Sequence, residues 1–150
     1  MRRPRIWLQA ARLSVLVGLF LNGLAYRVWA APVSSLIERF QECVPDREIL
    51  LTLAGDCNAD GIEDLVVMYR ENENENRMVA VYSSNGNFLV SEWTRAPLEN
   101  YRMQWRDIDE RPPVELLVSG QKGIHIGFAV FRFVEGKWIS LFGEGMEDCC

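Results

Sequence analysis

The sequence repeats itself with a spacing of 51 residues. Residues 56–67 carry acidic or amide side chains at their first, third and ninth positions and then three apolar residues, and residues 107–118 show the same pattern. At a spacing of 50, the turn sequence of residues 85–88 overlays residues 135–138. A loop and a turn that recur at matching distances indicate a duplicated supersecondary unit. Each unit should therefore read strand, loop, strand, turn, strand, turn, strand.

Short runs rich in β-branched and aromatic residues, separated by turn-forming residues, predict eight strands. They span residues 49–53, 65–69, 78–82, 88–93, 101–105, 115–119, 124–133 and 138–142. Residues 32–41 predict one short helix, with a capping-box pattern at Ser35 and Glu38. The predicted fold class is mainly β: two four-stranded antiparallel repeat units, each resembling a propeller blade, preceded by one short N-terminal helix. Two units are too few to close a propeller ring, so we expect two sheets packed face to face or one long bent meander.

The first 30 residues have the three zones of a secretory signal peptide. Arginines at positions 2, 3, 5 and 12 precede a mostly apolar stretch at residues 13–26, which is shorter than the roughly 20 residues that a bilayer span needs. Val28 and Ala30 then fit cleavage after Ala30. We predict an extracytoplasmic protein, periplasmic or secreted, with a β-rich repeat domain at residues 31–142, an acidic tail at residues 143–150, and no stable membrane insertion after cleavage.

The charge of the exported part limits its partners. The chain has 16 basic and 21 acidic residues, and five of the basic ones are arginines of the signal peptide, which leaves 11 basic residues in the exported part. Such an acidic surface repels a phosphate backbone, so nucleic acid is not an expected partner. We expect this acidic surface to favour cations as binding partners.

Residues 56–64 have the pattern D-x-N-x-D-G-x-x-D. Calcium takes six to eight oxygen ligands, and five candidates lie here: the side chains of Asp56, Asn58, Asp60 and Asp64 and the carbonyl of Ile62. Position 12 of the loop is apolar, so the loop is not an EF-hand. It resembles the calcium loops of integrin-type FG-GAP repeats, which implies a bound Ca²⁺ that stabilises the fold. The alternative is an Asx-rich turn without an ion.

The second copy of the loop departs from this pattern. Arg111 replaces the third ligand, and Pro112 replaces the glycine. We expect Arg111 to supply by salt bridge the positive charge that a cation would otherwise give, so only the first loop is a candidate calcium site.

The chain ends in an acidic segment, residues 143–150, with two glycines and the adjacent Cys149 and Cys150. This composition predicts a mobile, solvated tail that does not bury its thiols. A bridge between neighbouring cysteines closes a loop too short to stabilise a fold. The pair therefore indicates chemistry, either capture of a soft metal ion or reversible oxidation.

An export signal, a domain of about 120 residues with the stretch D-C-N-x-D-G-I-E-D-L-V-V at residues 56–67, and a Cys-Cys end together resemble the SaoC family of Cys-Cys-COOH (seleno)proteins. The resemblance spans most of the chain. It implies the selenocysteine-assisted organometal system, with membrane transporter components and an organomercurial-lyase-like protein as partners. It also implies that Cys149 and Cys150 handle mercury, as Hg²⁺ or alkylmercury. Some members carry selenocysteine at one terminal position, but both positions are cysteine here, so no selenium chemistry is carried over.

Two further cysteines, Cys43 and Cys57, have two interpretations. A disulfide between them would tie the helix to the acidic loop and stabilise the fold by roughly 3 kcal/mol. Alternatively, they are a second thiol pair that receives metal from the tail. No nucleophile–base pair, phosphate loop or cofactor motif has a recognisable spacing, so the sequence favours a binding or transfer protein over an enzyme. A calcium-stabilised extracellular interaction module and a thiol–disulfide redox protein are the alternatives.

Overall fold

The computed structural model describes residues 32–150, so the predicted signal peptide, residues 1–30, lies outside the described residues. In chain order the elements are α1 (Val33–Cys43), β1 (Ile49–Gly55), β2 (Asp64–Asn72), β3 (Glu75–Ser84), β4 (Asn87–Val90), β5 (Thr94–Ala96), β6 (Glu99–Arg106), β7 (Glu115–Lys122), β8 (His125–Val134), β9 (Lys137–Glu144) and α2 (Met146–Cys149). Within residues 32–150, no helix combines the length and the apolar composition that crossing a bilayer requires.

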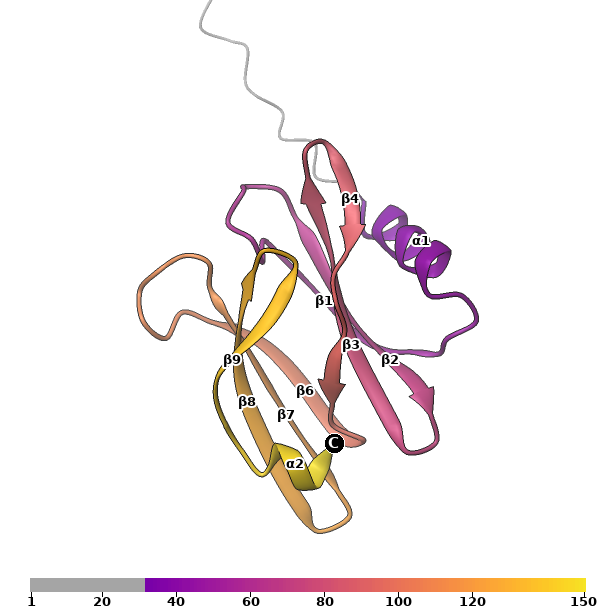
Figure 1. Cartoon of the computed structure of the whole chain (residues 1–150), viewed down its shortest axis with the longest axis vertical. Coiled ribbons are helices and arrows are strands. Elements are labelled where there is room, and N and C mark those ends of the chain that lie inside the picture. The colour runs from indigo at the N-terminus through magenta and orange to yellow at the C-terminus, as the bar shows by residue number, and fades with distance from the viewer. Residues whose placement is uncertain (1–31) are drawn as a thin grey trace, which may run out of the picture.

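The strands form two antiparallel sheets, one from each repeat (Figure 1). The first has the order β1-β2-β3-β4, with the short β5 also paired to β3, and the second has the order β6-β7-β8-β9. In the central hairpins Leu65 lies opposite Val81, and Leu116 lies opposite Phe131, so the registers of the two units differ by one residue. The predicted fold class, two four-stranded antiparallel units after a short helix, is confirmed. The strand β5 and the helix α2 are additions that the sequence patterns did not predict.

The two sheets pack face to face, which decides between the two expected arrangements. Val66 and Met68 of β2 lie in one buried cluster with Leu116 and Val118 of β7. Because successive side chains of a strand point to opposite faces, the alternate residues of β2 point away from this cluster.

The helix α1 covers the outer face of the first sheet. Its Leu36 and Phe40 are fully buried, in a second cluster with Leu65 and Val67, and Phe40 packs on Tyr69 with 5.4 Å between ring centroids. Burying a side chain of this size contributes about 1.5–3 kcal/mol. Burial on both faces explains why β2 begins with six consecutive buried residues.

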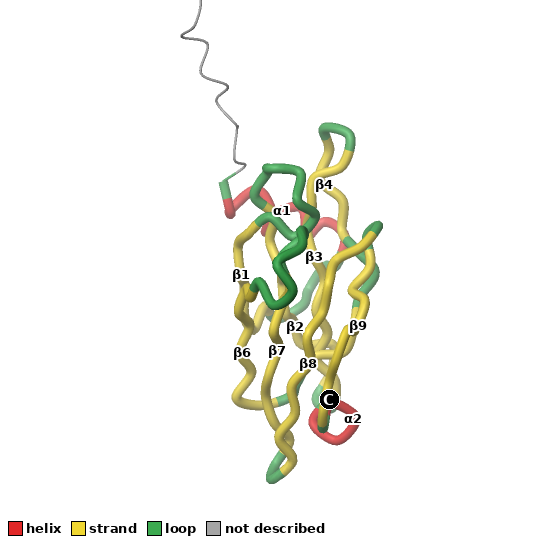
Figure 2. The backbone as a smooth tube through the Cα atoms, turned by 90° about the vertical axis from the view of Figure 1, so that its left-hand side faces the viewer, coloured by secondary structure: helices red, strands yellow, loops and turns green. Residues whose placement is uncertain are grey.

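Among the described elements, no helix covers the outer face of the second sheet, where apolar side chains such as Ile126 and Phe142 stay exposed. The two helices lie toward opposite ends of the molecule, α1 near the β3–β4 hairpin and α2 at the C-terminus (Figures 1 and 2).

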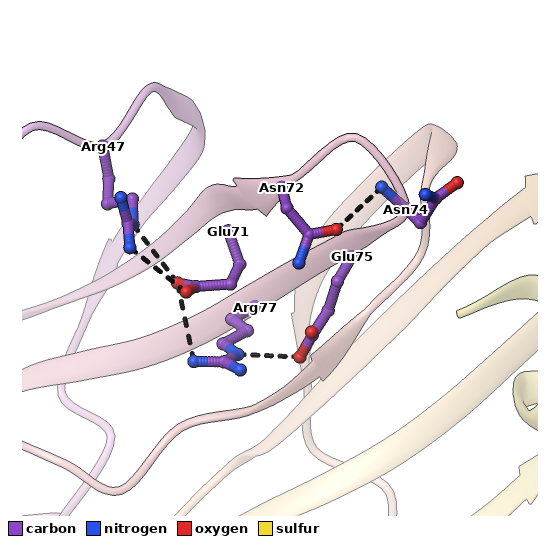
Figure 3. A network of polar contacts seen from close by, with 6 residues as sticks. All are labelled: Arg47, Glu71, Asn72, Asn74, Glu75 and Arg77. Atoms are coloured by element: carbon purple, nitrogen blue, oxygen red, sulfur yellow. Dashed lines mark hydrogen bonds and ion pairs between the residues drawn. The ribbon is translucent and has the colours of Figure 1, made fainter.

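The acidic and amide run at residues 71–76 forms the β2–β3 hairpin (Figure 3). Glu71 accepts hydrogen bonds of 3.2 and 3.1 Å from the guanidinium of Arg47, and Arg77 lies 3.5 Å from Glu71 and 2.8 Å from Glu75. Asn76, by contrast, is fully buried. Its amide donates a 2.8 Å hydrogen bond to the carbonyl of Pro97 and thereby holds the β5–β6 connection.

Candidate functional site

The C-terminal segment is folded, contrary to the prediction of a mobile, solvated tail at residues 143–150. The strand β9 continues to Glu144, where it still pairs with Phe128. One helical turn follows, in which the N–H groups of Asp148 and Cys149 lie 3.3 and 3.2 Å from the carbonyl oxygen of Gly145. The thiol-bearing Cys149 is fully buried, while Cys150 is half-buried.

The two glycines that suggested mobility instead permit close packing. Gly145 has a φ of 68°, in the left-handed region that favours glycine. A Cβ atom on this residue would lie 2.4 Å from the carbonyl oxygen of Ile126. Composition alone cannot distinguish a flexible glycine from one that lets two backbones approach, and this is why the tail prediction was wrong.

Three sulfur atoms lie close together in α2 and in the residue that follows it. The Sγ atoms of Cys149 and Cys150 are 3.2 Å apart. The Sδ atom of Met146 lies 3.7 Å from the first and 3.9 Å from the second. Residues three and four apart share one face of a helical turn, which explains why Met146 meets both cysteines. The two cysteines were predicted as site residues and the methionine was not, although the M-x-x-C-C spacing is visible in the sequence.

Two of these three residues, Met146 and Cys150, border a cleft of about 530 Å³ between the β5 strand and the end of the second sheet. Cys150, Met146 and Arg95 all line it, with Phe131 and Ala129 as apolar neighbours. Burial raises the pKa of the Cys150 thiol, and its hydrogen bond with Cys149 raises it further, whereas the charge of Arg95 acts in the opposite direction. Cys150 is therefore held as a thiol at neutral pH until a ligand displaces its proton.

A backbone hydrogen bond fixes α2 to the body of the protein. The N–H of Leu98 donates to the carbonyl oxygen of Cys149 over 3.2 Å. Leu98 belongs to the same connection that Asn76 holds through Pro97. The side chain of Asn76 thus holds the connection to which Cys149 is hydrogen-bonded, and in this way it helps to position the thiols.

The first acidic loop is organised by its own backbone. Asp56 accepts hydrogen bonds from the N–H groups of Asp60 and Gly61, at 3.1 and 2.8 Å. Asp60 accepts one from the N–H of Ile62 at 2.8 Å and another from the hydroxyl of Ser83. Burial alone would raise the pKa of Asp60, but these hydrogen bonds outweigh it and lower the pKa below its ordinary value.

Asp64, the last of the predicted calcium ligands, has a structural role. It is fully buried, and it accepts hydrogen bonds from the N–H of Cys57 at 3.0 Å, the thiol of Cys57 at 3.1 Å and the N–H of Ser83 at 2.9 Å. Burial is the main reason that the pKa of Asp64 is raised, and the hydrogen bonds oppose that shift. Its oxygens are already used inside the protein, and the remaining candidates are the half-buried Asp56, Asn58 and Ile62 carbonyl and the exposed Asp60.

The second loop has the same pattern of hydrogen bonds to a buried carboxylate, and an arginine side chain pairs with its acidic residues. The buried Glu115 accepts a 2.9 Å hydrogen bond from the N–H of Ile108, as Asp64 does from Cys57 51 residues earlier. The guanidinium of Arg132 forms ion pairs with Glu115 and, at 2.7 Å, with Asp109. The expectation that Arg111 supplies this charge was wrong, since Arg132 of β8 does so.

The acidic side chains of this second loop are close together. Within the described part of the chain, Asp107, Asp109 and Glu115 are the one group whose three acidic ligand atoms lie within 4.8 Å of one another. The guanidinium of Arg132 supplies positive charge to this group, as a bound cation would otherwise do.

The predicted disulfide between Cys43 and Cys57 is absent from the described structure, where both are free cysteines. Cys43 is exposed at the end of α1, on the outer side of the first sheet, whereas Cys57 is fully buried in the cluster between the sheets. Because the sheet separates the two side chains, the alternative of a joint second metal site also fails. The sequence carried no sign that the two cysteines lie on opposite sides of the first sheet.

Comparison of the chain with protein-family models, with curated proteins and with solved structures found no match in any of the three. The function of the site therefore has to be argued from its own chemistry.

Proposed function

We propose that this protein, exported by its N-terminal signal, captures a soft metal ion or an organometal cation with the thiols of Cys149 and Cys150. Mercury, as Hg(II) or alkylmercury, is the proposed cargo. The observation that carries the proposal is the 3.2 Å separation of the two Sγ atoms, with Cys150 lining a cleft. Two sulfurs held side by side suit a thiophilic cation.

The different environments of the two thiols support a capture in two steps. Cys150 lines the cleft and meets an incoming ion first, while Cys149 is buried behind it. Binding releases one proton from each thiol, so acid weakens capture. The charge of Arg95 in the same cleft partly offsets the burial that raises the pKa of the Cys150 thiol.

Transfer to a second protein is the proposed outcome of capture. Release to another thiol-bearing protein proceeds through the exposed side of Cys150, since a new thiolate has access there. The resemblance to the SaoC family proposes membrane transporter components and an organomercurial-lyase-like protein as recipients. No step of this proposal requires the protein to make or break a carbon–metal bond, so we propose a binding and transfer protein.

A competition titration of Hg(II) between the reduced protein and a small dithiol tests the proposal. The variants are a chain that ends at Asp148, Cys149→Ser and Cys150→Ser, all in a Cys43→Ser background that removes the exposed unrelated thiol. We expect the truncated chain to lose more than about 100-fold in affinity, because even changes behind the first ligands of a metal cost 10–100-fold.

Equal mercury affinity in the full-length and truncated chains would overturn the proposal. A thiol–disulfide exchange rate that Cys149→Ser abolishes, without tight metal binding, would favour the redox function instead.

A further inference from the structure

The position of Met146 allows its sulfur atom to bind a ligand as well as to pack. It opens α2, three residues before Cys149 and four before Cys150. Its thioether sulfur faces both thiols, at 3.7 and 3.9 Å. It also lines the cleft that Cys150 borders, and so it is reachable by the same incoming ion.

The three sulfurs form a compact triangle with sides of 3.2, 3.7 and 3.9 Å. A point equidistant from them lies about 2.1 Å from each, close to the roughly 2.3 Å of a zinc–thiolate bond. A linear ion between two sulfurs would need them about 4.6 Å apart at that bond length, well beyond the 3.2 Å between Cys149 and Cys150. The arrangement therefore fits three-coordinate binding better than linear two-coordinate binding.

The donor set also indicates the class of ion. Two thiolates and a thioether are soft ligands, and such sets select Cu(I) over harder divalent ions. A univalent ion with two thiolates leaves a complex of charge −1, and the exposed guanidinium of Arg95 lies in the same cleft to balance it.

We propose that Met146, Cys149 and Cys150 form a three-sulfur site for a soft univalent cation, Cu(I) or Ag(I). The proposal rests on the proposed function, because the two cysteines are the primary ligands in both. It adds a third ligand and, beside mercury, a second class of cargo. Binding displaces two thiol protons, and neither the metal nor the protein changes its oxidation state.

Ag(I) is the probe, since it does not change oxidation state under ordinary conditions. Met146→Leu removes the thioether and keeps an apolar side chain of similar volume. Met103→Leu is the matched control, because Met103 is buried in the same inter-sheet cluster but belongs to β6. In competition with a chromophoric chelator, Met146→Leu should bind Ag(I) at least tenfold more weakly than Met103→Leu.

A second readout needs no substitution. In wild-type protein with ¹³C-labelled methionine methyl groups, one equivalent of Ag(I) should shift the Met146 signal far more than that of Met103. This measurement keeps the proposal testable even if Met146→Leu lowers stability.

The outcomes separate the two proposals. If the chain ending at Asp148 loses Ag(I) binding while Met146→Leu keeps it and the Met146 methyl signal stays unmoved, the third ligand is wrong and thiol capture stands. If the truncated chain binds Ag(I) as well as the full chain does, both the three-sulfur site and thiol capture by this pair fail.

Discussion

Gly127 of β8 lies so close to Cys149 of α2 that a Cβ atom on residue 127 would be 2.7 Å from the Cys149 Sγ atom. The same Cβ would be 2.6 Å from the carbonyl oxygen of Gly145. Side-chain carbons do not approach other heavy atoms this closely in folded proteins, so the burial of the thiol depends on glycine at position 127.

Gly127→Ala should therefore displace α2 and expose the Cys149 thiol. We expect Cys149 to react severalfold faster with a thiol reagent in this variant, because displacement removes its cover while β8 itself is retained. The measurement is the modification rate in a Cys43→Ser background, with mass spectrometry to locate the modified residue.

The control for this substitution is Gly123→Asn in the β7–β8 turn. Residue 123 has a φ of 60°, which asparagine tolerates, and no atom lies within 4 Å of a Cβ there. The control should leave the reactivity of Cys149 unchanged. An unchanged rate in Gly127→Ala would contradict the packing described here.

The four thiols should react in an order set by their burial. In the native, reduced protein we expect Cys43 to react fastest and Cys150 next, while Cys149 and Cys57 react only on local or global opening. Burial, followed by the charge of Asp64, raises the pKa of Cys57, which lowers its thiolate fraction still further.

Timed alkylation of the thiols and peptide mapping of the unreduced protein check this order and the absent disulfide together. We expect no peptide that links Cys43 to Cys57. Recovery of that linkage in high yield would mean that the loop leaves the inter-sheet core, and the separation of the two residues by the first sheet would be wrong.

The strands were predictable because their side chains alternate or form continuous apolar runs between turn residues. The duplication was predictable because the acidic loop and the turn recur at spacings of 51 and 50 residues. Face-to-face packing was one of two expectations, and the buried cluster shared by β2 and β7 decided it.

The parts that sequence could not predict depend on contacts between distant residues. Arg132, rather than Arg111, neutralises the second loop because the β7–β8 register brings it beside Glu115. The Cys149 thiol is buried because Gly127, on the strand β8, leaves room for it. Neither relation leaves a local pattern in the chain.

The calcium site of the first loop is still a prediction, now with fewer ligands. With Asp64 engaged by Cys57 and Ser83, we expect only weak binding, in the millimolar range of extracellular modules. Calcium at five times the dissociation constant then contributes about 1 kcal/mol by mass action. In a domain of this size, that amounts to about 4 °C in melting temperature.

Thermal melts with calcium and with a chelator measure this shift. Asp60→Asn should abolish it, while Asp109→Asn in the second loop should not. Identical wild-type curves in calcium and in chelator would leave the loop as an Asx-rich turn without an ion.

The pair of Asp109 and Arg132 predicts a loss of stability in acid. The hydrogen bond and charge of Arg132 hold the pKa of Asp109 below its ordinary value, which is about 3.9 in unfolded chains. Between the unfolded and the folded pKa, the folded protein binds fewer protons at this residue than the unfolded chain. The stabilisation is therefore complete above the unfolded pKa and is lost as the pH falls through the folded pKa.

Asp109→Asn should flatten this part of the profile. The measurement is the free energy of unfolding from urea titrations between about pH 5 and pH 2, where the ordinary carboxylate pKa lies. Glu63→Gln, an exposed residue of the first loop, is the control and should keep the wild-type slope. Equal slopes in wild type and Asp109→Asn would show that the ion pair does not couple to folding.

The last prediction concerns Arg132 and Glu115, the ion pair at the start of β7. Glu115 is fully buried, and Arg132 is the cation that faces it. Arg132→Leu leaves this carboxylate with the N–H of Ile108 as its remaining described donor. Removing one partner of a buried pair costs more than removing both, because the remaining charge has no compensation.

Arg132→Leu should therefore lower the melting temperature clearly more than Arg111→Leu, whose guanidinium forms no ion pair within residues 32–150. The double variant Arg132→Leu/Glu115→Leu should recover part of the loss, since it removes the buried charge together with its partner. Thermal melts of wild type, both single variants, the double variant and the Arg111 control complete the cycle. Additive losses in the double variant, or an equal effect of Arg111→Leu, would contradict the assignment of Arg132 as the cation of the second loop.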